Sequence, residues 1–273
     1  MKFSLRLLTF VAMLMGCATL SAQEVNPVTP KEVRLDDDVQ VRARAILDIP
    51  LARNLSLDWS EQVRMHNNVS DVDKIVSSVG ISYKALPWLK VGASYGFVNT
   101  RDEETDGLGN TTVEWKIRHQ ANVDITGSYK LGRVKLSLRE RVRFAFRGDS
   151  VSSYEHADPF ITLRSRFKAA YDIRQCRWEP YAAVELYTTL NARGAVPNYL
   201  NYNVAYKQYI NRLRFTLGTE FKINNYHRLD IYYHFHMNQS YEARYKANKG
   251  DLKRWDHEKQ NCHVIGIDYK FKL

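Results

Sequence analysis

The chain has 273 residues, of which 44% are hydrophobic, and its 40 Lys and Arg against 30 Asp and Glu leave a net charge of +10 at pH 7. This length suits one large β-domain or two ordinary ones, and we expect one because no Pro-, Gly- or Ser-rich linker divides the chain. No run of roughly 18 apolar residues predicts a membrane-spanning helix. The basic charge fits an acidic ligand, lipid headgroups or a basic pore lining. No motif supports nucleic acid as a partner.

The first 22 residues have the pattern of a secretory signal peptide. Lys2 and Arg6 precede an apolar run from Leu7 to Met15, and small residues then lead to a cleavage site after Ala22. The apolar run is too short to remain as a membrane span. We therefore predict that residues 1–22 are cleaved and that the remainder is exported.

Two further features lie near this N-terminus. The tetrapeptide ending at Cys17 partly resembles a lipobox, so lipidation of Cys17 is an alternative to cleavage after Ala22. Residues 23–38 carry two prolines and an acidic triplet, and we expect them to form a mobile lead. Residues 39–273 are then predicted to be a single β-barrel domain.

Apolar and polar side chains alternate strictly in segments longer than most soluble strands. In residues 113–130, Trp115 and Ile117 fall on one face, and Lys116 and Arg118 on the other. A period of two indicates β-strands, since a helix would not separate these side chains onto opposite faces.

Eleven segments have this strand pattern, and the connections between them alternate between short and long. Tight turns at one end and longer loops at the other are typical of membrane barrels. The predicted strands are 39–48, 55–65, 74–84, 89–98, 113–130, 134–147, 160–173, 178–190, 209–222, 227–238 and 257–273.

Aromatic residues gather near both ends of these segments, as expected where a barrel crosses the two membrane interfaces. One band flanks the short turns, with Tyr83, Trp88, Tyr129, Tyr171, Trp178, Phe221, Tyr226, Tyr269 and Phe271. The other flanks the long loops, with Tyr95, Phe97, Trp115, Phe144, Phe146 and Phe160. The chain also ends on an alternating strand. We predict an all-β, antiparallel, up-and-down transmembrane β-barrel of about 10–12 strands.

Two points remain open in this fold prediction. A soluble, lipocalin-like periplasmic binder would show the same alternation with its apolar face inward. Bacterial membrane barrels usually have an even number of strands, whereas eleven segments are visible. The mature cysteines, Cys176 and Cys262, fall at opposite ends of the expected barrel, so we predict two free thiols.

The polar face is rich in arginine and is predicted to line the lumen. A charged lumen either attracts anions through a pore or is filled by networks of Arg, carboxylate and water, and in a barrel this narrow packing is the simpler expectation. The predicted basic ladder consists of Arg42, Arg44, Arg118, Arg139, Arg141, Arg143, Arg164, Arg166, Arg212 and Arg214.

A second candidate site is polar and lies on one strand. Asp230, Tyr232, His234 and His236 share the lumen face, and histidines can bind metal or transfer protons. Their spacing along one strand is too wide for a chelate without a partner strand. We therefore expect no metal and no cofactor.

Catalysis would require a nucleophile, a base and an orienting group. His119 and Glu140 are polar outliers on the apolar face, and an outer-membrane lipid-modifying enzyme is an alternative function. A two-residue turn at Leu131-Gly132 would place His119 opposite Phe144 and Glu140 opposite Val123, so these two residues would not be partners. The same register pairs Asp124 with Arg139. We expect no catalytic residues.

The segments LSLDWSEQVR, NRLRFTLGTEFK and HRLDIYYHFHMN, together with the Ser-Ala-Gln junction, resemble the bacterial outer-membrane barrels grouped as domain of unknown function 2490. The resemblance implies an outer-membrane barrel of a Gram-negative bacterium, with no assigned functional residues. The expected partners are outer-membrane lipids and, during assembly, the barrel-insertion machinery. The ligand is unknown. The resulting hypothesis is a structural or binding barrel, or a narrow anion-preferring pore with an Arg-rich lumen.

Overall fold

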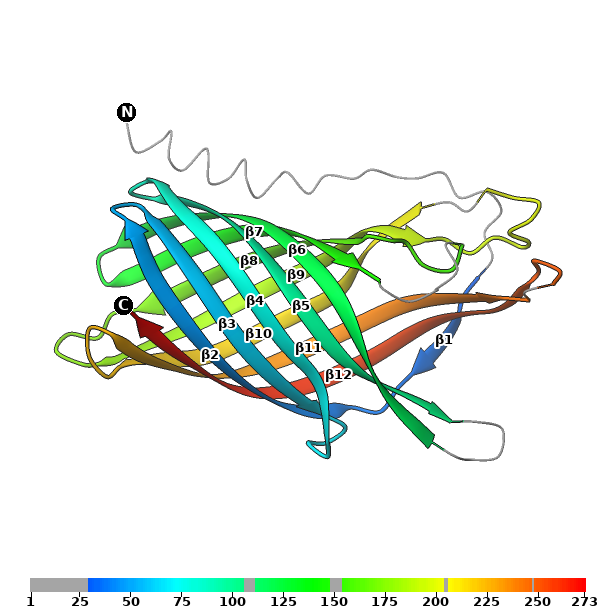
Figure 1. The fold of residues 1–273 in the computed structure, drawn as a ribbon, viewed down its shortest axis with the longest axis horizontal. Coiled ribbons are helices and arrows are strands. Elements are labelled where there is room, and N and C mark those ends of the chain that lie inside the picture. The colour runs from blue at the N-terminus through cyan, green and yellow to red at the C-terminus, as the bar shows by residue number, and fades with distance from the viewer. Residues whose placement is uncertain (1–28, 106–110, 148–153, 204–205, 247) are drawn as a thin grey trace.

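The computed structural model describes residues 29–105, 111–147, 154–203, 206–246 and 248–273. The predicted signal peptide and Cys17 lie outside these residues. Within them, one sheet of twelve strands is formed (Figure 1). The strands are β1 (Lys31–Arg34), β2 (Asp38–Ala52), β3 (Leu55–His66), β4 (Asp71–Leu86), β5 (Leu89–Thr105), β6 (Thr111–Leu131), β7 (Val134–Phe146), β8 (Phe160–Tyr171), β9 (Trp178–Arg193), β10 (Tyr206–Lys222), β11 (His227–Tyr245) and β12 (Leu252–Lys272).

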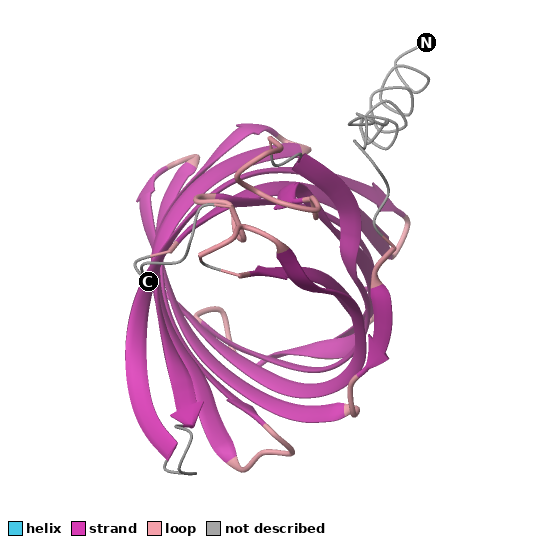
Figure 2. Ribbon diagram, turned by 90° about the vertical axis from the view of Figure 1, so that its right-hand side faces the viewer, coloured by secondary structure: helices cyan, strands magenta, loops and turns pink. Residues whose placement is uncertain are grey.

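The barrel closes between its first and last wall strands. β2 to β12 pair in sequence as antiparallel neighbours, and β12 then pairs with β2 in parallel, from Cys262 opposite Asp38 to Lys272 opposite Asp48. Eleven wall strands give β2 and β12 the same direction, so a parallel ladder satisfies both edges. The fold prediction is confirmed, and the odd count is accommodated by this closure. Figure 2 shows the closed wall from its end.

β1 lies in the predicted N-terminal lead and continues the line of β2. It pairs in parallel with β12 from Lys31 opposite Asp256 to Arg34 opposite Lys259. Lys259 Nζ also donates to Glu32 Oε1 at 2.7 Å, which lowers the pKa of the Glu32 carboxyl. β1 therefore extends the first wall strand and adds no strand to the ring.

The two ends of the barrel differ in the length of their connections. The turn end carries the C-terminus and most of the short connections, and the loop end carries the two longest connections, residues 147–159 and 194–205 (Figure 1). One turn differs from its prediction: Gly132 and Arg133 form the loop, so Leu131 faces Val134. Gly132 has a φ of 58°, which favours glycine as the first loop residue.

This turn moves the expected β6–β7 register by two residues. Asp124 faces Arg141 and His119 faces Phe146, while Glu140 faces Ile125. A shift of two keeps every side chain on its predicted face. The predicted pairing of Asp124 with Arg139 is therefore wrong, although the assignment of faces is unaffected.

The outer wall is apolar. Exposed large side chains recur at alternate positions along the strands, among them Trp59, Val79, Ile81, Ile117, Val123, Phe215, Leu217, Ile265 and Ile267. A continuous apolar exterior on a closed sheet is suited to lipid, because each wall strand hydrogen-bonds to a neighbour on both sides. No helix in the described ranges has the length and apolar character needed to cross a bilayer.

The apolar core lies at the loop end, outside the lumen. Val196, Ala243, Tyr245 and Trp255 are buried together, and Tyr154 and Tyr199 stack at 3.8 Å beside them. The β9–β10 connection is therefore packed onto the long β11–β12 hairpin. Among the described cysteines, Cys176 is exposed and Cys262 is buried, and both are free.

Candidate functional site

The centre of the lumen holds a cavity of about 260 Å³ lined chiefly by polar side chains. Nine predicted ladder residues line it: Arg42, Arg44, Arg139, Arg141, Arg143, Arg164, Arg166, Arg212 and Arg214. Arg64 also contributes to the lining. Arg118 does not, because it lies two residues nearer the loop end than Gln120, which does.

Glu185 on β9 is the central carboxylate of this lumen. It is 3% exposed and accepts from Arg164 Nη2 at 2.7 Å and from Arg214 Nη1 at 3.0 Å. Arg166 Nε lies 3.7 Å away, and the Tyr187 hydroxyl donates to Glu185 at 2.9 Å. One carboxylate therefore serves three guanidinium groups, which leaves a local excess of positive charge.

Two other carboxylates neutralise one arginine each. Arg141 Nη2 lies 2.7 Å from Asp124 Oδ1, and Arg44 donates from both Nε and Nη2 to Asp268 Oδ2. Sequence reasoning did not single out Glu185 or Asp268 as the partners of these arginines. Glu185 could have been found, since it alternates with apolar Val184 and Leu186 along β9.

Arginines that line the central cavity lie directly opposite each other at three places in the wall. The cross-strand pairs are Arg42 with Arg64, Arg139 with Arg166, and Arg141 with Arg164. Directly opposed like charges destabilise a sheet. The carboxylates described above offset this for Arg141 and Arg164, whereas the described residues offer no ion-pair partner to Arg139.

The predicted polar site on β11 does not converge on one point. Asp230 accepts from the Tyr181 hydroxyl at 2.9 Å, and His234 Nδ1 lies 2.8 Å from Thr216 Oγ1. The Tyr232 hydroxyl donates to Asp268 at 3.1 Å. His236 is 1% exposed, and its Nε2 has no partner within the described chain. No three His, Cys, Asp or Glu side chains of the described residues gather closely enough to hold a metal ion.

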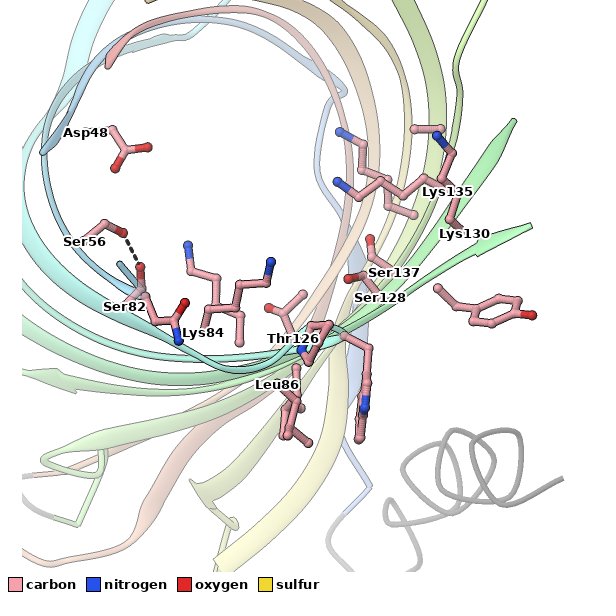
Figure 3. Close-up of a pocket in the computed structure, with 18 of the residues that line it drawn as sticks. Asp48, Ser56, Ser82, Lys84, Leu86, Thr126, Ser128, Lys130, Lys135 and Ser137 are labelled. Carbon is pink, nitrogen blue, oxygen red and sulfur yellow. Dashed lines mark hydrogen bonds between the residues drawn. The ribbon is translucent and has the colours of Figure 1, made fainter. Parts of the chain in front are cut away.

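A basic vestibule of about 940 Å³ opens at the turn end (Figure 3). Ser56 and Ser82 hydrogen-bond across one side of it at 2.8 Å. Its carboxylates pair with lysines, for example Glu220 with Lys168 at 2.9 Å. Several lining cations have no carboxylate within ion-pair distance in the described part of the chain, namely Arg53, Lys84, Lys90, Arg133, Lys135, Arg228 and Lys272.

A family model described as "Protein of unknown function (DUF2490)" matches residues 40–247. The chain belongs to this family. The match spans the Arg-rich wall from Arg42 to Arg214 and includes Glu185, whereas Asp268 lies beyond it. No curated protein matches the DUF2490 chain.

Solved structures with a similar arrangement include outer-membrane OmpT of Vibrio cholerae. The in-vitro folded form is 13% identical with a TM-score of 0.36. The similarity covers 76% of the DUF2490 chain and 57% of the OmpT chain. The outer-membrane expressed form is 12% identical with a TM-score of 0.36, covering 74% and 60%. The DUF2490 chain thus spans less than two thirds of the length of these structures.

The outward polar residues of this DUF2490 protein have partners in the wall. His119 Nδ1 lies 2.8 Å from the Tyr95 hydroxyl, and its ring contacts Phe97 edge-on. Ser165 donates to Glu140 at 2.5 Å. His119 therefore bonds to a phenol, and Glu140 bonds to a serine on another strand, so the two outward residues have separate partners.

Proposed function

We propose that this protein is an outer-membrane barrel that binds small anions in its lumen and passes them through a narrow pore. The observation that carries the proposal is the excess of guanidinium groups around the central cavity, where Glu185 alone faces Arg164, Arg166 and Arg214. Rings of Arg and Lys select anions in pores because they stabilise negative charge at a constriction.

The exterior supports placement in the outer membrane. Side chains such as Ile117 and Leu217 are 58% and 65% exposed, and exposed apolar residues recur around the wall. Such a surface is unfavourable in water and suited to lipid. A lipocalin-like binder would have the opposite arrangement, with its apolar face inside.

The vestibule extends the same charge toward the turn end. The opening between the central cavity and the turn end is lined by Lys84, Lys90 and Lys135, which lack carboxylate partners among the described residues. A continuous basic lining raises the local concentration of anions and lowers that of cations. The vestibule and the central cavity therefore favour the same sign of solute.

Bilayer recording tests this proposal. Purified protein is inserted into a planar bilayer under a KCl gradient, and the reversal potential is measured. We expect a preference for chloride that weakens in the double variant Arg139→Gln with Arg166→Gln. The matched control, Lys31→Gln with Arg34→Gln, removes the same charge from β1 and leaves selectivity unchanged.

Two outcomes would contradict the proposal. A preference for cations would show that the guanidinium groups do not set the potential of the lumen. An absence of conductance, together with no anion-dependent change in stability, would show a sealed structural barrel.

A further inference from the structure

Seven of the ten arginines that line the central cavity form two layers that differ in their acceptors. In the layer nearer the turn end, Arg44, Arg141 and Arg214 each contact a carboxylate. The layer nearer the loop end, called here the amide-held layer, consists of Arg42, Arg64, Arg143 and Arg212. On β2, β7 and β10, the amide-held arginine lies two residues toward the loop end from the neutralised one.

Each arginine of the amide-held layer donates to a neutral side-chain amide. Arg42 Nη2 donates to Gln40 at 2.9 Å, and Arg64 Nε donates to Gln62 at 2.8 Å. Arg143 Nε donates to Asn122 at 3.4 Å, and Arg212 Nε donates to Asn238 at 2.5 Å. An amide oxygen orients a guanidinium group without cancelling its charge, so all four charges remain uncompensated.

These four side chains face one another across the lumen. Arg42 and Arg64 are cross-strand neighbours, and all four line the same cavity. The charged groups that act most strongly on Arg64 are all cationic: Arg42, Arg143, Arg212 and Arg214. Buried charge of one sign is costly unless an opposite charge accompanies it.

The nearby carboxylates of the described chain are already engaged. Glu185 pairs with Arg164 and Arg214, Asp124 pairs with Arg141, and Asp268 pairs with Arg44. Arg42 is 8% exposed, and its Nε has no hydrogen-bond partner among the described side chains. A buried, unpartnered donor on the cavity wall is an independent indication of a missing acceptor.

We propose that the amide-held layer is a binding site for a compact oxyanion of the phosphate class. Guanidinium groups present planar forks of N–H donors that match the paired oxygens of a phosphoryl group. With Nε of Arg64, Arg143 and Arg212 held by amides, their remaining terminal N–H groups are available to such a ligand. A single-atom anion such as chloride has no paired oxygens to match the two donors of a fork.

This inference deepens the proposed function and rests on the same lumen. Binding of inorganic phosphate to the full, detergent-folded barrel is measured by calorimetry at constant ionic strength, with chloride as the competing anion. We expect phosphate to bind in preference to chloride. Arg64→Gln should weaken phosphate binding by on the order of tenfold, since it removes charge-assisted hydrogen bonds.

Matched variants make the test specific. Arg244→Gln changes an exposed arginine of the β11–β12 hairpin and should leave phosphate binding unchanged. Arg143→Gln repeats the test from the opposite wall if Arg64→Gln does not fold. Free phosphate and a lipid phosphate are separated by adding phosphatidylglycerol micelles, which should not compete because the site lies inside the wall.

The inference is overturned if phosphate binds no better than chloride, or if neither Arg64→Gln nor Arg143→Gln weakens it. Competition by phosphatidylglycerol would equally overturn a lumen site. Reversal potentials measured on the same preparations separate the two proposals. Anion selectivity without phosphate binding would contradict only the phosphate site. Phosphate binding with cation selectivity would contradict only the anion-selective pore.

Discussion

Arg42 on β2 lies directly opposite Arg64 on β3, and each guanidinium donates to a glutamine two residues earlier on its own strand. Two like charges thus share one rung of the barrel wall without a carboxylate between them. Evolution of a barrel for stability alone would not favour this arrangement, because opposed like charges repel. The pair is consistent with a lumen built to receive an anion.

Replacement of Arg64 should therefore stabilise the empty barrel. In buffer without phosphate, Arg64→Gln relieves repulsion with Arg42 and should raise the free energy of unfolding by about 0.5 kcal/mol. The measurement is the temperature at which the folded band is lost on SDS gels of unboiled samples. Arg34→Gln on β1 is the control. A lower transition temperature for Arg64→Gln would show that its contact with Gln62 outweighs the repulsion.

Removal of the central carboxylate should lower the free energy of unfolding, and by more than Arg64→Gln raises it. Glu185→Gln leaves Arg164, Arg166 and Arg214 without their shared counter-charge, and breaking a buried ion pair in this way costs about 3 kcal/mol. The same gel assay should show a much lower transition temperature. Asp124→Asn, which leaves only Arg141 unpaired, is the matched comparison and should cost less. Equal losses would argue against Glu185 as the centre of the network.

A glycine beside the lumen tyrosine tests the packing of the wall. A Cβ at Gly266 would overlap the ring of Tyr232, which is buried and donates to Asp268. Gly266→Ala must displace that ring and should destabilise the barrel by about 1–3 kcal/mol. Gly127→Ala is the control, because nothing lies within 4 Å of its added Cβ. Similar unfolding transitions for the two variants would mean that Tyr232 moves freely.

The outward carboxylate on β7 offers a test of the membrane-facing surface. Glu140 lies midway along its strand on the apolar face, with Ser165 as its donor at 2.5 Å. Charged groups at this depth are unfavourable in lipid, so Glu140→Leu should stabilise the bilayer-inserted barrel by about 1 kcal/mol.

Unfolding in lipid vesicles measures this effect, and Ser165→Ala in the same assay should destabilise the protein by leaving Glu140 without its donor. Destabilisation by Glu140→Leu would indicate that this carboxylate contacts something other than lipid.

Much of the architecture was predictable because alternation is a local property. The eleven segments from 39–48 to 257–273 correspond to the wall strands β2–β12, and their faces are as predicted. The β6–β7 register was misplaced by two residues because the conformation of Gly132, rather than the hydrophobic pattern, sets that turn. The odd strand number conflicted with the usual rule until the parallel β2–β12 ladder accounted for it.

The sequence by itself determined which arginines face the lumen, since the two-residue period of a strand assigns each side chain to a face. It could not determine which of them are neutralised. Arg42 and Arg44 share a face two residues apart, yet the first contacts Gln40 and the second contacts Asp268, 224 positions along the chain. Only closure of the sheet brings such distant groups into contact, so the tertiary structure alone decided where the positive charge of the lumen remains unpaired.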